Sequence, residues 1–393
     1  MPGSIKDRVA IVGMGCTRFG ALWDKGPGDL IVEAVSEACQ DAGVGMQDIE
    51  AVWVGTLFSI GGRTVSEPLR IQYKPVTRVE NACASGHEAL RGAAYAVAAG
   101  IHDVVLAVGF EKLKDEGTSG LPGMENRTNT HYQSSMPGVF AMMANKYFDR
   151  YGLSPEEGRK MLARISVKSH ANGLLNPKAH LRRKLTVAQV LNAPIIAYPL
   201  GLFDCCGVSD GAAAAILCRA DKAKEFRSDP VYIKALQICT GPTSGRLLDD
   251  YDYTHVEEAY RAGVAAYREA GVRNPREEIS MAEVHDCFSI TEAVTMEDLQ
   301  FSPRGGVKED IDNGTFELKG KLPVQPDGGL KCFGHPIGAS GIRMVYELYL
   351  QLQGRAGERQ IKDPRLGLAH NMGGEPYAPA VSVAIVGQKG KGL

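Results

Sequence analysis

The sequence lacks an excess of charge of either sign. Its 44 lysines and arginines nearly balance its 46 aspartates and glutamates, and the formal net charge is −2. A nucleic-acid-binding protein would normally carry a clear basic excess, so we do not expect that class. The sequence also lacks an uninterrupted run of about twenty apolar residues, the length needed to cross a bilayer. We therefore expect no membrane span.

Paired cysteines are missing as well. The chain has nine cysteines, an odd number at irregular spacings and without a CxxC pair. The adjacent Cys205 and Cys206 are poorly placed for an ordinary disulfide, so we expect reduced thiols in a cytoplasmic protein. The first residues have no apolar signal-peptide core, and the last four, GKGL, differ from the peroxisomal SKL signal. Both observations fit a cytoplasmic location.

The sequence shows no P-loop, and its glycine spacings do not complete a GxGxxG motif that leads into a helix. A dinucleotide site is therefore not expected. What the sequence does show is an alternation of strand-like and helix-like runs. Residues 9–12 and 103–108 are buried-strand patterns, whereas residues 30–42 place apolar side chains on one helical face before Gly43. The alternation predicts an α/β fold with a largely parallel, covered sheet.

The second half of the sequence repeats features of the first half in the same order. The triplet AGV occurs at residues 42–44 and again at 270–272, where predicted helices end. The triplet ASG occurs at residues 84–86 and again at 339–341, where loops lead into predicted helices. Ordered matches of this kind indicate an internal duplication.

We therefore expect two related halves, residues 1–228 and 229–393. Residues 111–201 have no counterpart in the second half and would form an inserted domain. Insertions of this size are usually functional, and this one could cover a substrate channel. Its basic residues could bind the phosphates of a nucleotide tail, or they could simply begin a solvated helix; they are Arg182, Arg183 and Lys184.

The first candidate catalytic residue is Cys83, in the run NACASG just before a predicted helix. The positive end of a helix dipole lowers the pKa of a nearby thiol and makes it more nucleophilic. Small neighbours would let a substrate carbonyl approach, and the backbone N–H of Cys83 could point at an oxyanion. An isolated cysteine of this kind is more often a small core residue. The ASG repeat beside a histidine favours the catalytic interpretation.

That histidine is His335, in the run GHPIGASG. Pro336 and the flanking glycines fix a sharp loop before a helix and give the imidazole a defined orientation, as a general base requires. If a pseudo-twofold axis relates the halves, the two loop–helix junctions face one another. Cys83 and His335 would then form a nucleophile–base pair. The alternative is a surface-loop histidine bonded to backbone.

Two further runs could complete such a site. The run HDCF follows a predicted buried strand, where open α/β sheets place ligand sites. His285 could donate a hydrogen bond to a developing enolate oxygen, Cys287 could transfer a proton, and Asp286 could hold a neighbouring loop. Adjacent strand residues point to opposite faces, so we expect no metal site here. The glycine pair at residues 373–374 could supply an oxyanion-hole N–H or form a plain turn.

Taken in order, these motifs resemble the thiolase family over essentially the whole chain. NACASG resembles the nucleophile loop and GHP the histidine motif of that family. HDCF is similar to the motif of the subgroup of sterol carrier protein thiolases and archaeal acetoacetyl-CoA thiolases. The resemblance implies a five-layered αβαβα fold of two duplicated halves. It also implies that the inserted domain binds coenzyme A as a substrate, with no permanently bound cofactor.

The resemblance implies a role for each candidate residue. Cys83 would attack the 3-keto carbon and become acylated. His335 would help to deprotonate Cys83 and would also donate to the thioester oxygen of the enolate. His285 would complete that oxyanion hole, and the backbone N–H groups of Cys83 and Gly373 would form a second one.

One position departs from the family pattern. Typical thiolases have a second catalytic cysteine where this chain has Asn371. The subgroup is thought to use the cysteine of HDCF instead, which is Cys287 here. Which of the two residues serves the second proton transfer is left open by the sequence.

The implied function is CoA-dependent cleavage or Claisen formation of a 3-oxoacyl-CoA, with an acyl group that could be bulky or aromatic. A ketoacyl synthase or a side-chain aldolase of the same fold is an alternative, and so is a non-catalytic acyl-CoA-binding subunit. Cys287 and Pro336 favour the thiolase, and an aldolase would not need Cys83. The resemblance further implies a homodimer or dimer of dimers and a small zinc-ribbon/OB-fold partner protein. Residues 117–136 would shape the acyl pocket.

Overall fold

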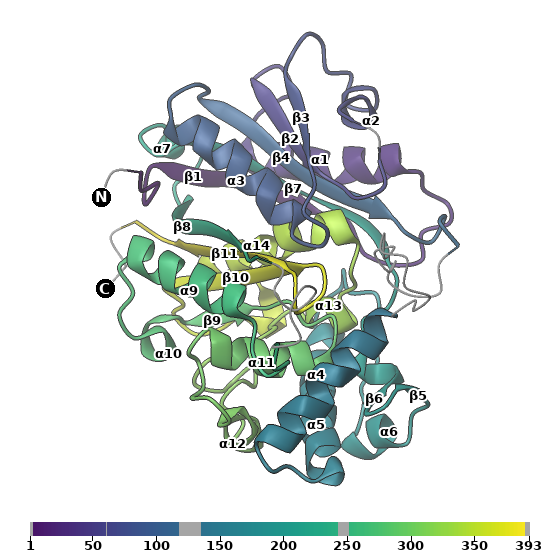
Figure 1. Cartoon of the computed structure of the whole chain (residues 1–393). Helices are drawn as coiled ribbons and strands as arrows, with labels where there is room; N and C mark the ends of the chain where they lie inside the picture. The colour runs from purple at the N-terminus through teal and green to yellow at the C-terminus, as the bar shows by residue number, and fades with distance from the viewer. Residues whose placement is uncertain (1–2, 60, 118–134, 243–250, 390–393) are drawn as a thin grey trace.

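A sheet of nine strands forms the centre of the protein (Figure 1). The computed structural model describes residues 3–59, 61–117, 135–242 and 251–389. The strands of the sheet, in chain order, are β1 (Val9–Cys16), β2 (Ala51–Gly55), β3 (Val76–Val79), β4 (Val104–Lys112), β7 (Asp210–Arg219), β8 (Val231–Thr240), β9 (Met281–Glu283), β10 (Leu366–Gly373) and β11 (Ala380–Gly387). Across the sheet they follow the order β3-β2-β4-β7-β1-β8-β11-β10-β9.

The sheet is mixed rather than largely parallel. β2 pairs in parallel with β3 and β4, and β9 pairs in parallel with β10, whereas the other neighbouring strands are antiparallel. Our expectation of a largely parallel sheet was therefore wrong, because β7 and β11 return against their neighbours. A strand buried on both faces has the same continuous apolar pattern in either direction, and β7 is buried along nearly its whole length.

The helices divide the molecule into layers. They are α1 (Pro27–Ala42), α2 (Arg63–Ser66), α3 (Ser85–Ala98), α4 (Met136–Arg150), α5 (Pro155–Leu174), α6 (Val187–Leu191), α7 (Ala223–Phe226), α9 (Glu257–Ala270), α10 (Pro275–Glu278), α11 (Ser289–Asp298), α12 (Val307–Asp312), α13 (Gly329–Cys332) and α14 (Ile337–Leu352). Short 3₁₀ turns span Leu202–Asp204 and Gly357–Arg359. Among the described residues, none of the helices combines the length and apolar character that a bilayer crossing requires.

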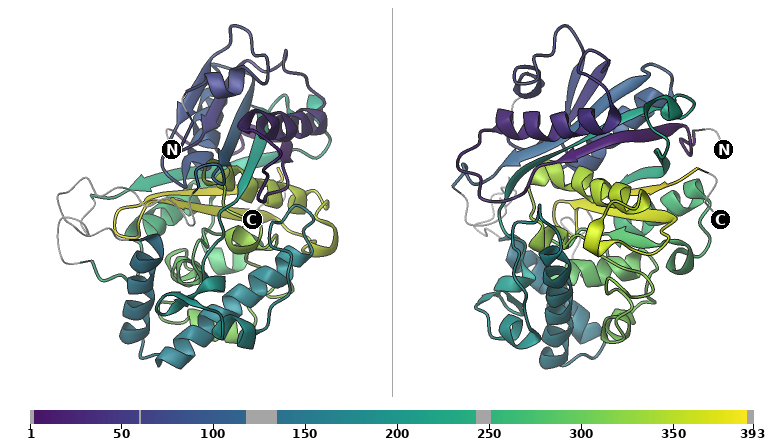
Figure 2. Two further views of the ribbon diagram at one scale, coloured as in Figure 1. Left: turned by 90° about the vertical axis from the view of Figure 1, so that its right-hand side faces the viewer. Right: turned by 180° about the vertical axis from the view of Figure 1, so that it is seen from behind.

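Figure 2 shows α1 on the outer side of the first-half strands and α14 between those strands and the second-half strands. α3 packs on β2 and β4 and against α14, which also contacts β4, β7 and β10. α9 covers the other face of β8 and β11. The layers are thus helix, first-half strands, middle helices, second-half strands and helix, which confirms the expected five-layered α/β fold.

The two halves of the sheet have the same strand order. In the first half β1 is followed outward by β7, β4 and β2, and in the second half β8 is followed by β11, β10 and β9. The halves join where β1 pairs with β8 through Ala10 and Ile11. This correspondence supports the duplication inferred from the sequence. The predicted boundary at residues 228 and 229 lies in the segment between α7 and β8 and stays a prediction.

Glycines allow the middle layer to pack unusually tightly. A Cβ atom on Gly86 of α3 would lie 2.7 Å from the carbonyl oxygen of Gly338 in α14. A Cβ atom on Gly341 would lie 2.6 Å from the backbone nitrogen of His87, and one on Gly109 of β4 would lie 2.0 Å from the Gly338 oxygen. Only glycine fits at these positions. The contact brings the N-terminal ends of α3 and α14 together, and with them the loops that carry the predicted nucleophile and base.

A buried ion cluster holds α14 in place. Arg343 is fully buried, and its guanidinium lies 2.6 Å from a carboxylate oxygen of Glu283 in β9 and 2.6 Å from one of Asp327. Burial raises the pKa of Glu283 and the nearby Asp327 carboxylate raises it further, whereas the Arg343 guanidinium lowers it. Arg343 therefore fastens α14 to the strand that leads to the HDCF run.

The inserted residues form a separate group of elements beside the second half. Here α4, α5 and α6 accompany a two-stranded ribbon of β5 (Ile195–Ala197) and β6 (Leu200–Gly201), and α5 lies against α11 and α13 (Figure 1). Lys168 of α5 forms a buried ion pair with Glu292 of α11. Most of the segment 117–136, which we expected to shape the acyl pocket, lies outside the described residues.

We expect Arg343→Met to lower the free energy of unfolding by about 3–5 kcal/mol, because it leaves two buried carboxyl groups without their cation. Denaturant-induced unfolding followed by circular dichroism would measure the loss. Arg261→Met is the matched control, because the Arg261 side chain is 68% exposed and pairs with Glu257 on the surface. It should change stability by less than about 1 kcal/mol. Equal effects of the two substitutions would contradict the importance of the cluster.

Candidate active site

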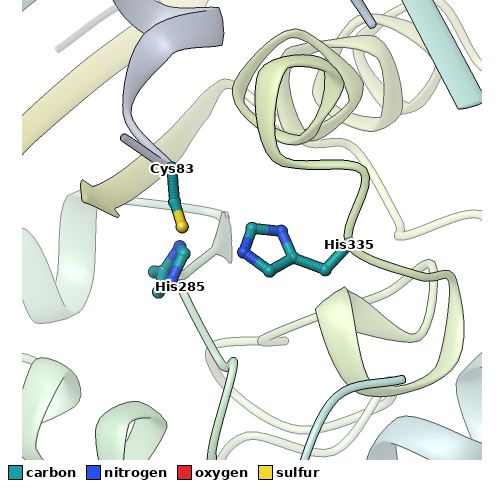
Figure 3. A group of neighbouring side chains, drawn as sticks. All are labelled: Cys83, His285 and His335. Carbon is teal, nitrogen blue, oxygen red and sulfur yellow. The ribbon is translucent and has the colours of Figure 1, made fainter. Parts of the chain in front are cut away.

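Three predicted catalytic side chains meet at the junction of the halves. The Cys83 sulfur and one ring nitrogen each of His285 and His335 lie within 4.8 Å of one another. The two imidazole rings are nearly perpendicular, at 80°, with centroids 5.1 Å apart. Figure 3 shows a nitrogen of each ring directed toward the sulfur. Cys83 precedes α3, His335 precedes α14 and His285 follows β9, so three separate chain segments converge on one point.

The resting side chains are uncharged. Burial lowers the pKa of His335 to about 3 and lowers that of His285 well below its usual value. Part of Cys83 reaches solvent, yet protein atoms surround its thiol, and this burial raises the thiol pKa to about 12. We expected the helix end to lower that pKa. The expectation was wrong, because the cost of burying a thiolate and the nearby Glu111 carboxylate together outweigh the backbone N–H groups that favour it.

A neutral thiol needs a base beside it before it can attack a carbonyl. His335 is fully buried, and its Nδ1 lies 2.7 Å from the hydroxyl oxygen of Ser340. Its Nε2 has no hydrogen-bond partner among the described residues. This nitrogen is therefore available to the Cys83 proton.

His285 is held from the opposite side. Its Nδ1 lies 3.3 Å from the side-chain nitrogen of Asn371, and its backbone N–H donates to Nδ1 of His370 at 3.3 Å. All three side chains are buried. Asn371, which stands at the position of the missing family cysteine, is therefore in contact with His285.

Cys287 is buried next to the same site. Its sulfur lies 3.8 Å from the Thr291 hydroxyl, and its carbonyl accepts a hydrogen bond from the backbone N–H of Cys206 at 2.8 Å. Burial raises the pKa of its thiol well above the usual value, and the nearby Cys83 sulfur, beside which a second thiolate would be repelled, raises it further. Cys287 therefore lies near Cys83 as a protonated thiol.

Between His285 and Cys287, Asp286 has a structural role. Its carboxylate accepts a hydrogen bond from the backbone N–H of Leu330 at 2.6 Å and lies 3.5 Å from the Lys331 ammonium. These contacts tie the HDCF loop to α13, the short helix that leads to His335. The positions of the two histidines are thereby coupled.

Glu111 was missed by the sequence analysis. It is the last residue but one of the largely apolar β4, and its carboxylate accepts hydrogen bonds from the backbone N–H groups of Leu57 and Gly338, at 3.1 and 3.0 Å. Leu57 belongs to the first half and Gly338 to the second, so Glu111 joins the halves beside the nucleophile. A buried carboxylate at the end of an apolar strand was the signal that could have revealed it.

The glycine pair at the end of β10 lies against the nucleophile loop. A Cβ atom on Gly373 would lie 2.1 Å from the carbonyl oxygen of Asn81 and 2.9 Å from the backbone nitrogen of Cys83. The backbone N–H of Gly374 reaches the Cys83 thiol and partly offsets the effect of burial on its pKa. Gly373 as an oxyanion-hole donor stays a prediction, and Gly374, the other member of the pair, is a second candidate.

The basic run lies in a loop and does not begin a helix. Arg182, Arg183 and Lys184 are exposed, and α6 starts only at Val187. The residues just before them are bonded to the chain that precedes His335, because the backbone N–H groups of residues 180 and 181 donate to the carbonyls of residues 333 and 332. The positive charges are thus anchored to the histidine loop.

The high thiol pKa predicts how Cys83 should react. At pH values below the thiol pKa, the thiolate fraction grows by about tenfold per pH unit. In the enzyme without substrate, the rate of Cys83 alkylation by iodoacetamide should therefore rise steadily from pH 7 to above pH 9. Mass spectrometry of the peptide that contains Cys83 would measure the rate. A plateau below pH 8 would instead reveal a thiolate–imidazolium pair.

Comparison with known proteins places these features in a family. A family model described as thiolase, N-terminal domain, matches residues 9–190, and one described as thiolase C-terminal domain-like matches residues 242–387. An acetyl-CoA acetyltransferase of Methanothermobacter thermautotrophicus is 39% identical over 387 residues, which cover 95% of this chain and 98% of that protein. The benzoylsuccinyl-CoA thiolase subunit BbsB of Thauera aromatica is 30% identical and covers 94% and 96%.

A solved structure shares the architecture as well. The structure described as Ltp2-ChsH2(DUF35) aldolase superposes with a TM-score of 0.82 at 25% sequence identity, covering 98% of this chain and 99% of that chain. The two family models together span both halves of the sheet, including the loops of Cys83, His285 and His335. The relatives match nearly the full length of the chain. On its motifs, its layered fold and these matches, the chain belongs to the thiolase family.

Proposed function

We propose that this protein is an acyltransferase that cleaves or forms the C2–C3 bond of a 3-oxoacyl-CoA through an acyl-Cys83 intermediate. One observation carries the proposal. The Cys83 sulfur and the ring nitrogens of His285 and His335 lie within 4.8 Å of one another. A nucleophile, a base and an oxyanion donor are thus brought to one carbonyl carbon by a single chain.

The first half of the reaction begins with the neutral thiol. His335 takes the Cys83 proton on Nε2 while the sulfur attacks the 3-keto carbon. The C2–C3 bond then breaks, and the electron pair is delocalised onto the thioester oxygen of the leaving enolate. His285 and the newly protonated His335 donate hydrogen bonds to that oxygen. Because burial keeps His285 neutral, it acts as a hydrogen-bond donor without a charge of its own.

The enolate must next receive a proton at C2. Cys287 supports this step, because its thiol is protonated and lies next to Cys83. Asn371 does not suit it, because an amide side chain offers hydrogen bonds but no acidic proton at neutral pH. The proton that His335 took from Cys83 then restores the Cys287 thiol. His335 next accepts the proton of the coenzyme A thiol as that thiol attacks acyl-Cys83, and it returns the proton to the Cys83 sulfur as the new acyl-CoA leaves. We assign the second proton transfer to Cys287.

Coenzyme A enters this scheme as a substrate. Arg182, Arg183 and Lys184 are exposed and sit on a segment bonded to the chain before His335. Cationic side chains bind phosphate through charge-assisted hydrogen bonds, so we assign the CoA phosphates to this run. The remaining predictions are the homodimer or dimer of dimers, the division of the chain at residue 228, and the cytoplasmic location that nine free cysteines favour.

Two relatives bear on substrate and partner. BbsB is named as a subunit of a benzoylsuccinyl-CoA thiolase, and Ltp2 is named together with ChsH2(DUF35). On this basis we propose a bulky or aromatic acyl group and a second, small zinc-ribbon/OB-fold protein for this chain as well. The aldolase structure also supports a second candidate function, cleavage of a CoA-linked hydroxyacyl side chain. Such a reaction would leave Cys83 unacylated.

We expect Cys83→Ala to reduce thiolysis of 3-oxoacyl-CoA substrates at least about 1,000-fold, because the covalent route disappears. A panel of aliphatic and aromatic 3-oxoacyl-CoAs with coenzyme A, followed by loss of the 3-oxoacyl absorbance, would measure it. Mass spectrometry of the wild type should show an acyl group on the Cys83 peptide. Cys39→Ala is the matched control, because Cys39 is a partly exposed thiol on the distant helix α1.

Full turnover by the Cys83 variant would end the covalent mechanism. A protein that releases a carbonyl product from a 3-hydroxyacyl-CoA, without acylation of Cys83, would favour the aldolase. A protein that binds acyl-CoA and turns over neither substrate would be a non-catalytic subunit.

The assignment of Cys287 can be separated from that of Cys83. Transfer of an acetyl group from acetyl-CoA to Cys83 requires no proton at C2, whereas thiolysis and deuterium exchange at C2 both do. We expect Cys287→Ala to retain acetylation of Cys83 and to lose about 10²–10⁴-fold in thiolysis and exchange. Cys218→Ala, a buried thiol in β7, should leave all three unchanged. Normal exchange in the Cys287 variant would rule out its proposed role.

A further inference from the structure

We infer that Ser340 and Asn371 are positioning residues that fix opposite tautomers on the two active-site histidines. His335 would present a bare ring nitrogen to the Cys83 sulfur, and His285 would present a ring N–H. The catalytic consequence rests on the proposed function, whereas the tautomers themselves are a property of the resting protein.

Ser340 determines the tautomer of His335. The Ser340 hydroxyl donates to the carbonyl of Pro336 at 2.9 Å, which uses its one proton. Its oxygen also lies 2.7 Å from Nδ1 of His335. Since the hydroxyl has no second proton to give, it accepts from Nδ1–H. The ring is neutral, because burial lowers its pKa to about 3. Nε2 therefore carries a lone pair, as a base for Cys83 requires.

Asn371 determines the tautomer of His285 in the opposite sense. The atom it presents to Nδ1, at 3.3 Å, is its side-chain nitrogen, which can only donate. Nδ1 of His285 must then accept, and the single proton of this neutral ring is on Nε2. That N–H is the donor that an oxyanion hole needs. The two rings are thus made chemically different by two neighbours that do not touch the substrate in our scheme.

The first half contains the counterpart of this arrangement. Ser85 occupies the same place in its ASG triplet as Ser340 does in the other. Its hydroxyl donates to the carbonyl of Ala82 at 2.6 Å and accepts from the backbone N–H of Asn81 at 2.9 Å. In each half the serine hydroxyl thus donates to a carbonyl in the loop before its helix and accepts from a group of that loop. In the second half that group is the imidazole of His335, so the corresponding serine closes a loop in one half and holds a histidine in the other.

The same arrangement predicts how the site treats metal ions. A thiolate and two imidazoles are ligands that zinc and cobalt prefer, and the three ligand atoms here lie within 4.8 Å of one another. A ring N–H, however, has no lone pair to give to a metal. By holding the His285 proton on Nε2, Asn371 would keep metal ions off the nucleophile.

The direct test is nuclear magnetic resonance of the full-length protein labelled with ¹⁵N-histidine, at neutral pH and without substrate. Long-range proton–nitrogen correlations distinguish a protonated ring nitrogen from a bare one. We expect a protonated Nε2 in His285 and a protonated Nδ1 in His335, assigned through His285→Gln and His335→Gln. The same tautomer in both rings, or the reverse pair, would overturn the inference.

Asn371→Asp and Asn371→Leu provide matched variants of nearly equal size. Aspartate can only accept, so it should move the His285 proton to Nδ1 and free Nε2, which is the arrangement that metal-binding histidines adopt with carboxylates. Leucine should remove the preference for one tautomer. Neither should change the His335 tautomer. These shifts also identify the His285 resonances independently, should the glutamine variants fail to fold.

Titration with Co²⁺ alone gives a second readout. We expect Asn371→Asp to bind Co²⁺ at least tenfold more tightly than the wild type, with a thiolate–cobalt absorption band that disappears when Cys83→Ala is added. Equal Co²⁺ affinity in the wild type and Asn371→Asp would contradict the inference. Neither experiment needs turnover. A protein with the expected tautomers but no thiolysis would refute the proposed function alone, and an active protein with other tautomers would refute this inference alone.

Discussion

The structure depends on the contact between the N-terminal ends of α3 and α14. Backbone meets backbone there, because a side chain on Gly86 or Gly341 would collide with the opposite helix, and one on Gly338 would collide with carbonyls near the ends of β2 and β4. Helix surfaces without side chains are expensive in conformational entropy, so the chain gains little stability from the glycines themselves. The benefit of the glycines is that they position the two catalytic loops. Two loops that are far apart in the sequence thereby lie close together in space. The Glu111 carboxylate joins them by accepting hydrogen bonds from both halves.

Burial then determines the protonation states of the catalytic side chains on those loops. A thiol with a pKa near 12 and an imidazole with a pKa near 3 do not exchange a proton at rest. The nucleophile is formed only as it attacks, and the charge that develops passes directly to the substrate oxygen. Because reactivity and oxidation of cysteine both follow the thiolate, a resting neutral thiol is also protected. The buried Arg343 and its carboxyl partners hold the framework in which this balance is set.

Much of this could be predicted from the sequence, and the rest depends on distances that a sequence does not contain. The two ASG triplets located the meeting point of Cys83 and His335, and the fold class followed from the alternation of elements. The predicted strand directions were partly wrong, since a strand buried on both faces, such as β7, has the same apolar composition whether it is parallel or antiparallel to its neighbours. The predicted lowering of the Cys83 pKa was wrong because desolvation depends on every atom around the thiol, and the sequence showed only the neighbouring helix. The contact of Asn371 with His285 joins residues that are 86 positions apart, and no local pattern shows it.

The matching strand order of the two halves has a consequence for the history of the fold. A symmetric ancestor made of two identical half-chains would have placed the same residue on both facing loops, giving either two thiols or two imidazoles at the centre. Neither pair is a nucleophile with its base. Joining the halves in one polypeptide, across the β1–β8 ladder, let each loop change without its copy. Genetic fusion would thus have been the event that made asymmetric chemistry available to a symmetric scaffold.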